Sequence, residues 1–163
     1  MLDCLHGNGP AALERQHVIA AACARVWSCE VHASPTGPAA IDALFSSGGV
    51  LTAVAEIKAR DLSLRALQRM RPAGYLISLD KLRHGRTIAK ALGVMFVVIV
   101  GLDADGLIVW WPISNGAGQW QTTFSTAYTE TAATCNGGTA RRLNAYLSLT
   151  DMHLLDGALR WLN

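Results

Sequence analysis

The sequence is poor in charge and has no paired cysteine motif. Only 16% of its 163 residues are charged and 51% are hydrophobic, a balance that excludes a largely disordered chain. No two of the four cysteines are spaced as CxxC, and none belongs to a Cys/His cluster that would suggest zinc. We therefore expect reduced thiols, and a hydrophobic core in which every buried charge needs a partner.

A targeting segment and a membrane span are also lacking. The first ten residues include Asp3 and His6 and show no apolar stretch of a signal peptide. The most apolar run, residues 91–102, is too short to cross a bilayer and is followed by Asp103 and Asp105. These features predict a cytoplasmic protein without a membrane partner, and the length fits a single domain over residues 1–163.

The basic residues are concentrated in one part of the chain. Residues 58–90 hold nine of the fourteen lysines and arginines and only two acids, a net charge of +7, whereas the other residues sum to −5. Such a cluster is typical of a surface that binds a polyanion. It is equally typical of a solvated helix surface, and charge alone does not separate the two interpretations.

Hydrophobic periodicity and turn signals predict an α/β fold. Helices are expected at residues 10–26, 62–71, 79–92 and 151–162. Strands are expected at residues 27–33, 39–46, 50–58, 75–78, 94–100 and 107–113, with one or two more at residues 139–149. This order favours a mixed central β-sheet flanked by helices, with a core at about residues 10–113 and a C-terminal extension at residues 114–163.

Two acids and a lysine lie in strands that otherwise look like core. The only charged residues between positions 31 and 60 are Asp42, Glu56, Lys58 and Arg60. Because an unpaired carboxylate is costly to bury, these groups must be paired, hydrated or bound to a metal. Paired carboxylates suit Mg²⁺ or Mn²⁺, and the backbone carbonyl of Ile57 is a further oxygen donor. A salt bridge retained for structure is the competing interpretation.

The turn between the two central strands decides whether these acids meet. A plain two-residue turn at Gly48 and Gly49 would set Asp42 opposite Ala55, on the sheet face away from Glu56. One extra residue, in a three-residue loop or a glycine bulge, would set Asp42 opposite Glu56 instead. The candidate site therefore predicts the longer or bulged turn.

Asp42, followed after thirteen residues by Glu56-Ile57-Lys58, resembles the motif of the PD-(D/E)XK nuclease superfamily. The expected order of elements is similar to the α-β-β-β-α-β restriction-endonuclease-like core of that family, and residues 75–100 resemble its phage-type members. The resemblance implies a Mg²⁺- or Mn²⁺-dependent deoxyribonuclease, encoded by a phage or prophage, that hydrolyses DNA phosphodiesters with a metal-activated water. Ile41 stands where many members have proline.

The same resemblance implies that Asp42, Glu56 and Lys58 are catalytic, with Asp42, Glu56 and the Ile57 carbonyl on the metal. Glu14, on the first helix, has the place of an additional acidic ligand in many members, although a solvent-facing carboxylate is an equal interpretation. Contacts to nucleic acid are expected from the basic residues Arg60, Lys81, Arg83 and Arg86. Two further hypotheses are a catalytically inactive module of the same fold that binds nucleic acid or protein, and a homodimer that cuts both strands of a duplex.

Overall fold

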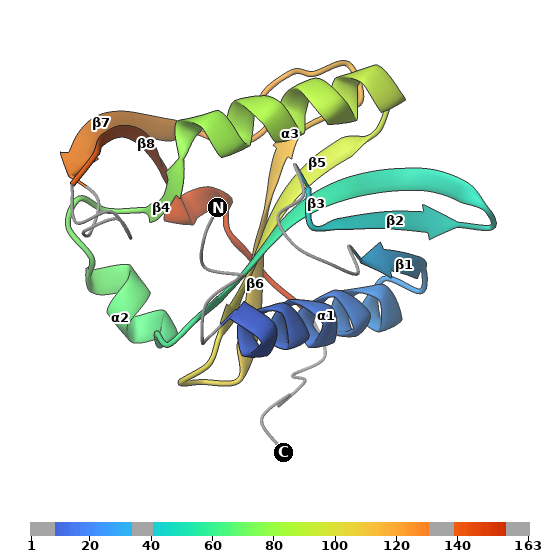
Figure 1. Cartoon of the computed structure of the whole chain (residues 1–163), viewed down its shortest axis with the longest axis horizontal. Coiled ribbons are helices and arrows are strands. Elements are labelled where there is room, and N and C mark those ends of the chain that lie inside the picture. The colour runs from blue at the N-terminus through green and yellow to red at the C-terminus, as the bar shows by residue number, and fades with distance from the viewer. Residues whose placement is uncertain (1–8, 34–40, 131–138, 156–163) are drawn as a thin grey trace.

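The computed structural model describes residues 9–33, 41–130 and 139–155 (Figure 1). In chain order the elements are α1 (Gly9–Val26), β1 (Glu30–Ala33), β2 (Ala43–Ser47), β3 (Val50–Arg60), α2 (Leu64–Arg69), β4 (Tyr75–Ser78), α3 (Leu79–Leu92), β5 (Met95–Leu102), β6 (Leu107–Ser114), β7 (Phe124–Glu130), β8 (Arg141–Leu147), a short 3₁₀ turn η1 (Leu149–Asp151) and β9 (His153–Leu154). None of the helices in these ranges is long and apolar enough to cross a membrane.

The central sheet has six strands in the order β1-β2-β3-β5-β6-β9. Strands β3 and β5 are parallel and all the other neighbours are antiparallel, so the sheet is mixed. A parallel pair needs a long crossover, and α2, β4 and α3 supply it between β3 and β5. The mixed α/β class predicted from the sequence is confirmed.

A second, smaller sheet has the order β4-β8-β7. The strand expected at residues 139–149 is β8, and it pairs with β4 through Tyr75 and Leu147. The helix expected from residue 151 is wrong for the described residues, because His153 and Leu154 pair with β6 as β9. The rest of that expected helix, residues 156–162, lies outside the described residues.

Two apolar layers enclose the central sheet, and Figure 1 shows α3 and α1 on its opposite sides. Alternating residues of β3 divide between the layers, as the period of a strand requires. Val54 packs on the side of α3 and the small sheet, and Ala53, Ala55 and Ile57 pack on the side of α1. A charged residue of β3 that lies an even number of positions from Val54 is therefore on the α3 side of the sheet, and one that lies an odd number away is on the α1 side.

The first strand is shorter than the sequence predicts. Helix α1 ends in a turn in which Ser28 has a φ of 51° and the Cys29 N–H donates to the Ala24 carbonyl at 2.9 Å. These hydrogen bonds use the carbonyls left unpaired at the end of the helix, so residues 27–29 close the helix instead of extending the strand. Strand β1 consequently begins at Glu30 rather than at residue 27.

The turn between β2 and β3 has two residues, but the hairpin contains the extra residue that the candidate site requires. Gly48 and Gly49 both have positive φ, 57° and 78°, as a tight two-residue hairpin turn demands. Ser46 is paired with Leu51, whereas Phe45 is paired with Ala53, so Thr52 is the extra residue of a β-bulge. The predicted bulge is confirmed, and its predicted position at the glycines is wrong.

Close packing at Gly85 brings α3 against the sheet. Gly85 faces the ring of Phe96 on β5, and a methyl group added at Gly85 would overlap that ring. Phe96 is fully buried in the layer between α3 and the sheet, so its ring has no room to move aside. The absence of a side chain at Gly85 therefore sets the height of α3 above β3 and β5.

We predict that Gly85→Ala lowers the free energy of unfolding by about 1–3 kcal/mol, the usual cost of overpacking a core. Alanine favours a helix over glycine by only about 1 kcal/mol, so the overlap with Phe96 outweighs the gain in propensity. Chemical denaturation measures the change. His84→Ala, on the exposed side of the same helix turn, is the control and should change stability little. Equal stability of Gly85→Ala and wild type would contradict the packing argument, and Phe96→Leu in the Gly85→Ala background should recover part of the loss.

Candidate functional site

Asp42, Glu56 and Lys58 meet on the α3 side of the central sheet. Ala43, the first residue of β2, pairs with Ala55 beyond the bulge. Asp42, which directly precedes Ala43, therefore lies beside Glu56. The Lys58 Nζ lies 2.7 Å from Glu56 Oε1 and 4.0 Å from Asp42 Oδ2. The structure therefore brings together the three side chains that the sequence singled out.

Glu56 is the buried centre of this group. Its side chain is 2% exposed, and two ammonium groups hold it: Lys58 at 2.7 Å from Oε1 and Lys81 at 3.4 Å from Oε2. Desolvating one carboxylate costs several kcal/mol, and a single ion pair often fails to recover this cost. Two cations on opposite oxygens allow Glu56 to stay in this layer. The Lys58 contact is an ion pair without an aligned hydrogen bond, and Oε1 accepts none from the described residues.

Asp42 is fixed by the backbone of β3. Its N–H donates to the Ala55 carbonyl at 2.8 Å, and its Oδ2 accepts from the Ile57 N–H at 2.7 Å. Burial raises the pKa of Asp42, and the nearby Glu56 carboxylate raises it further, against the opposing effects of Lys58, the Ile57 N–H and Lys81. Two carboxylates at close range thus disfavour each other's charge, which is the electrostatic condition of a cation site.

Lys58 remains a cation in this setting. Burial pulls the pKa of Lys58 down, but attraction to Glu56 and Asp42 and the contact with Glu56 outweigh burial, so the pKa lies above its usual value. Arg60 opposes this effect only slightly, as the last of the causes. Lys58 is therefore a fixed positive charge with no tendency to act as a base near neutral pH.

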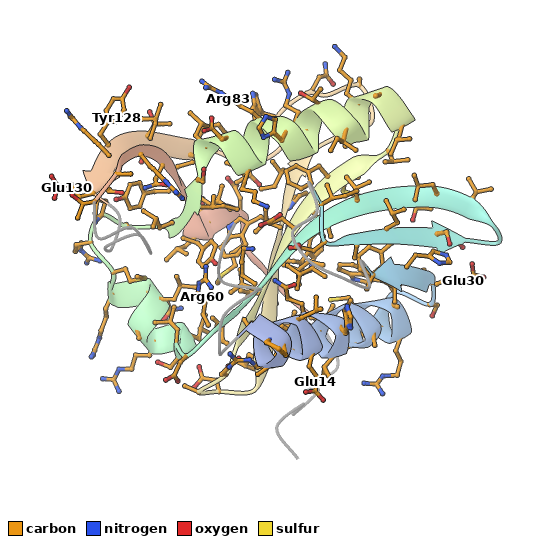
Figure 2. The ribbon with its side chains drawn as sticks, viewed as in Figure 1. Glu14, Glu30, Arg60, Arg83, Tyr128 and Glu130 are labelled. Atoms are coloured by element: carbon orange, nitrogen blue, oxygen red, sulfur yellow. The ribbon has the colours of Figure 1, made fainter. Side chains whose placement is uncertain are left out.

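The first helix contributes Gln16, not Glu14. Gln16 Nε2 donates to the Ile57 carbonyl at 2.9 Å, the carbonyl expected to face a metal. Glu14 is exposed and points away from the sheet (Figure 2), so the structure does not bring it to the site. The expectation of a ligand role for Glu14 is thereby corrected in favour of its alternative, a solvent-facing carboxylate.

Helical spacing explains this difference. Ile19 and Cys23 are fully buried on the face of α1 that packs on the sheet, and Gln16 lies one turn before Ile19 on that face. Glu14 instead shares a face with Val18, which is 41% exposed. The apolar stripe of α1 therefore identifies Gln16 as a residue that faces the sheet. Gln16 is not among the expected metal ligands because its side chain is an amide and not a carboxylate.

The four basic residues expected to contact nucleic acid occupy different surroundings. Arg60 and Arg83 are exposed, and Arg83 projects outward from α3 (Figure 2). Lys81 lies in the site, where its Nζ contacts Glu56 Oε2. Arg86 is held inside the protein surface, because its Nε donates to the Gly118 carbonyl at 2.6 Å and its guanidinium lies 4.6 Å from the centre of the Trp120 ring. Arg86 thus fastens the loop before β7 to α3, and its contact with nucleic acid stays a prediction.

Tyr75 is a polar neighbour of the site that the sequence analysis did not select. Its ring stacks on Trp111, with ring centres 5.4 Å apart, and its buried hydroxyl has the Arg60 guanidinium as a neighbour. Burial raises the pKa of Tyr75, and the charges of Arg60 and Lys58 lower it in part. The hydroxyl therefore lies in the positive field of the same cations that border the site.

The donor atoms suit a small hard cation. Asp42, Glu56 and the Ile57 carbonyl are all oxygen donors, and the Ile57 oxygen has a second lone pair besides the one that accepts from Gln16. Magnesium is usually bound by one or two carboxylates and keeps several water ligands, so this donor set fits it. Within the described ranges no group of three or more His, Cys, Asp and Glu side chains is arranged to hold a metal.

Comparisons of the chain with protein-family models, with curated proteins and with solved structures find no match.

We predict that Lys58→Met destabilises the fold by about 1–3 kcal/mol in EDTA, because Glu56 stays buried with only the more distant Lys81 as a partner. The double variant Glu56→Leu/Lys58→Met should recover most of this loss, since no unpaired charge then remains. Urea unfolding of the two single variants, the double variant and wild type gives the coupling free energy. Additive effects of the two single changes would show that the pair does not stabilise the fold.

Proposed function

We propose that this protein is a metal-dependent nuclease that hydrolyses DNA phosphodiester bonds, with Asp42, Glu56 and Lys58 as its catalytic residues. The observation that carries the proposal is the convergence of these three side chains across a bulged hairpin. The order α1-β1-β2-β3-α2-β4-α3-β5 also contains the α-β-β-β-α-β succession expected of a PD-(D/E)XK nuclease, with α2 and β4 as additional elements. A DNA substrate places its action inside a cell, as a phage or prophage product or otherwise.

Asp42, Glu56 and the Ile57 carbonyl would hold Mg²⁺ or Mn²⁺ in this proposal. The bound cation would polarise the scissile phosphate and lower the pKa of an attacking water. Gln16 fixes the Ile57 carbonyl through its 2.9 Å hydrogen bond. The Ile57 N–H fixes Asp42, so one residue holds a carboxylate ligand with its N–H and offers its own carbonyl as another ligand.

Lys58 supplies the fixed positive charge. Its side chain is 25% exposed, so its ammonium reaches both the buried Glu56 and the solvent from which a substrate arrives. There it can orient the attacking water and stabilise the charge that accumulates on the phosphate oxygens in the transition state. It performs both roles as a positively charged ammonium.

The exposed arginines extend this positive charge along the protein surface. Arg60 follows Lys58 by two residues on β3 and therefore lies on the same face of the sheet, next to the site. Arg83 projects outward from α3 and adds positive charge to the outer surface of that helix (Figure 2). Contacts from such side chains to a phosphate backbone are independent of sequence and weaken as salt rises. A dimer would present two such sites to the two strands of a duplex.

A second function has an observation of its own. Glu56 is almost completely buried and its two oxygens are already paired with lysines, an arrangement that serves structure without any metal. In that case the same fold binds nucleic acid through Arg60, Arg83 and their neighbours and cuts nothing. Cleavage and binding experiments separate these two proposals.

We predict Mg²⁺- or Mn²⁺-dependent cleavage of DNA that falls at least about 100-fold in Asp42→Asn, Glu56→Gln and Lys58→Met, since each removes a group that acts on the reacting phosphate. A panel of single-stranded, duplex and branched DNA, with each metal or with EDTA, measures it. Glu14→Gln, which changes an exposed carboxylate of α1, is the matched control and should cleave like wild type. Equal cleavage by wild type and the three site variants would sink the nuclease proposal.

We also predict that DNA binding in EDTA weakens linearly on a plot of log affinity against log salt. Arg60→Ala or Arg83→Ala should reduce the slope by about 1 each, because each removes one phosphate contact. Arg86→Ala should leave the slope unchanged, since its guanidinium is engaged by Gly118 and Trp120. Fluorescence anisotropy with a labelled oligonucleotide gives the slopes. Salt-dependent binding without cleavage in either metal would favour the binding module.

A further inference from the structure

The four charged side chains of the site balance one another. Asp42 and Glu56 contribute two negative charges, and Lys58 and Lys81 contribute two positive charges within 4.0 Å of them. Lys81 touches Glu56 at Oε2, one of the oxygens that a divalent cation would need. A dication and two ammonium groups around one buried carboxylate repel one another, so a bound metal and Lys81 favour different arrangements.

Of the two lysines, Lys81 is the one that can leave. Lys58 is held at 2.7 Å on the central strand β3 and also lies near Asp42. Lys81 makes one contact, at 3.4 Å, from the first turn of α3, and its side chain is 39% exposed. A long, partly exposed side chain with one distant partner can turn to solvent, and Glu56 then keeps Lys58 as its ion-pair partner.

We propose that Lys81 competes with the divalent cation for Glu56, and that it turns to a phosphate of the nucleic acid once the cation is bound. The inference rests on the proposed nuclease function and adds a role for a residue outside its catalytic set. In the absence of the cation, Lys81 neutralises Glu56 and keeps the positive and negative charges of the site equal in number. With the cation bound, the balance shifts to positive and Lys81 is available beside the reacting phosphate, at the start of α3.

This exchange has a physical benefit for the fold. With Lys58 alone, Glu56 would have a cation on only one of its oxygens before the divalent cation arrives, and Lys81 spreads the neutralisation over both oxygens. The same contact lowers the affinity for the cation, because binding must first displace it. Metal affinity and stability in EDTA should therefore change in opposite directions when Lys81 loses its charge.

The test measures Mn²⁺ affinity directly, by electron paramagnetic resonance of the free ion, without any substrate. Lys81→Met should bind Mn²⁺ about three- to tenfold more tightly than wild type, the range expected when a partly exposed ion pair is removed. Lys81→Arg, which retains a positive charge, should not tighten binding comparably. Arg83→Met, which removes a charge from the same helix without touching Glu56, is the matched control and should leave the affinity unchanged. Lys81→Gln gives a second neutral variant if the methionine variant folds poorly.

Two outcomes distinguish this inference from the proposed function. If Glu56→Gln abolishes Mn²⁺ binding but Lys81→Met binds no more tightly than wild type, competition by Lys81 is refuted and the metal site stands. If wild type binds no Mn²⁺, or if Glu56→Gln has no effect, the proposed metal site fails and the competition with it.

The second part of the inference concerns the phosphate. With thymidine 5′-monophosphate as a probe, wild type should bind more tightly in Mn²⁺ than in EDTA, and Lys81→Met should lose most of that gain, about five- to tenfold. Titration calorimetry in the two conditions measures both affinities, with Lys90→Met, which removes a charge from the last turn of the same helix, as the control. An undiminished gain in Lys81→Met would show that Lys81 does not turn to the phosphate.

Discussion

The register of the β2–β3 hairpin is the constraint on which the whole site depends. Thr52 is one residue more than the opposing strand has, and its Oγ1 donates to the Phe45 carbonyl at 3.1 Å, which ties the bulge to β2. Without this residue every side chain of β2 beyond the bulge would change faces. Asp42 would then lie on the α1 side, among alanines and isoleucines that offer its carboxylate no partner. One surplus residue near the glycine turn thus decides whether the acids share a layer.

The burial of Glu56 imposes a second condition, because an acid in this layer must be neutralised in every state of the protein. Lys58 and Lys81 do so from the sheet and from α3, and Gly85 allows α3 to come close enough for the 3.4 Å bridge from Lys81 to span the gap. Packing and electrostatics are therefore coupled: a helix set farther from the sheet would lengthen the contact from α3. Structural neutralisation and cation binding are two uses of one carboxylate, which is why geometry alone supports both a nuclease and a binding module.

Much of the site was predictable, and the failures have physical causes. The period of two along a strand placed Glu56 and Lys58 together, and the need for Asp42 to join them required an extra residue. The sequence does not show where that extra residue lies, because Gly48 and Gly49 satisfy a two-residue turn and Thr52 is an ordinary strand residue. On the first helix, the expected metal ligand was an acidic side chain because carboxylates bind metals. The residue on the buried face of α1 that reaches the site is instead an amide, Gln16. The partners of Arg86 lie more than thirty residues away in the chain, beyond the reach of any local pattern. The strand β7 was missed for a similar reason, since its alternation of polar and apolar residues is weak and its pairing with β8 is long-range.

The direct passage from β4 into α3 has a mechanical consequence. Ser78 ends a strand of the small sheet and Leu79 begins the helix, with no linker between them, while Gly93 leads from the other end of the helix into the central sheet. Helix α3 is thus connected directly to a different sheet at each end. Any movement of one sheet relative to the other must tilt α3 and alter the 3.4 Å distance between Lys81 Nζ and Glu56 Oε2. A displacement of the small sheet would in this way change the charge balance around Glu56 without any direct contact to that carboxylate.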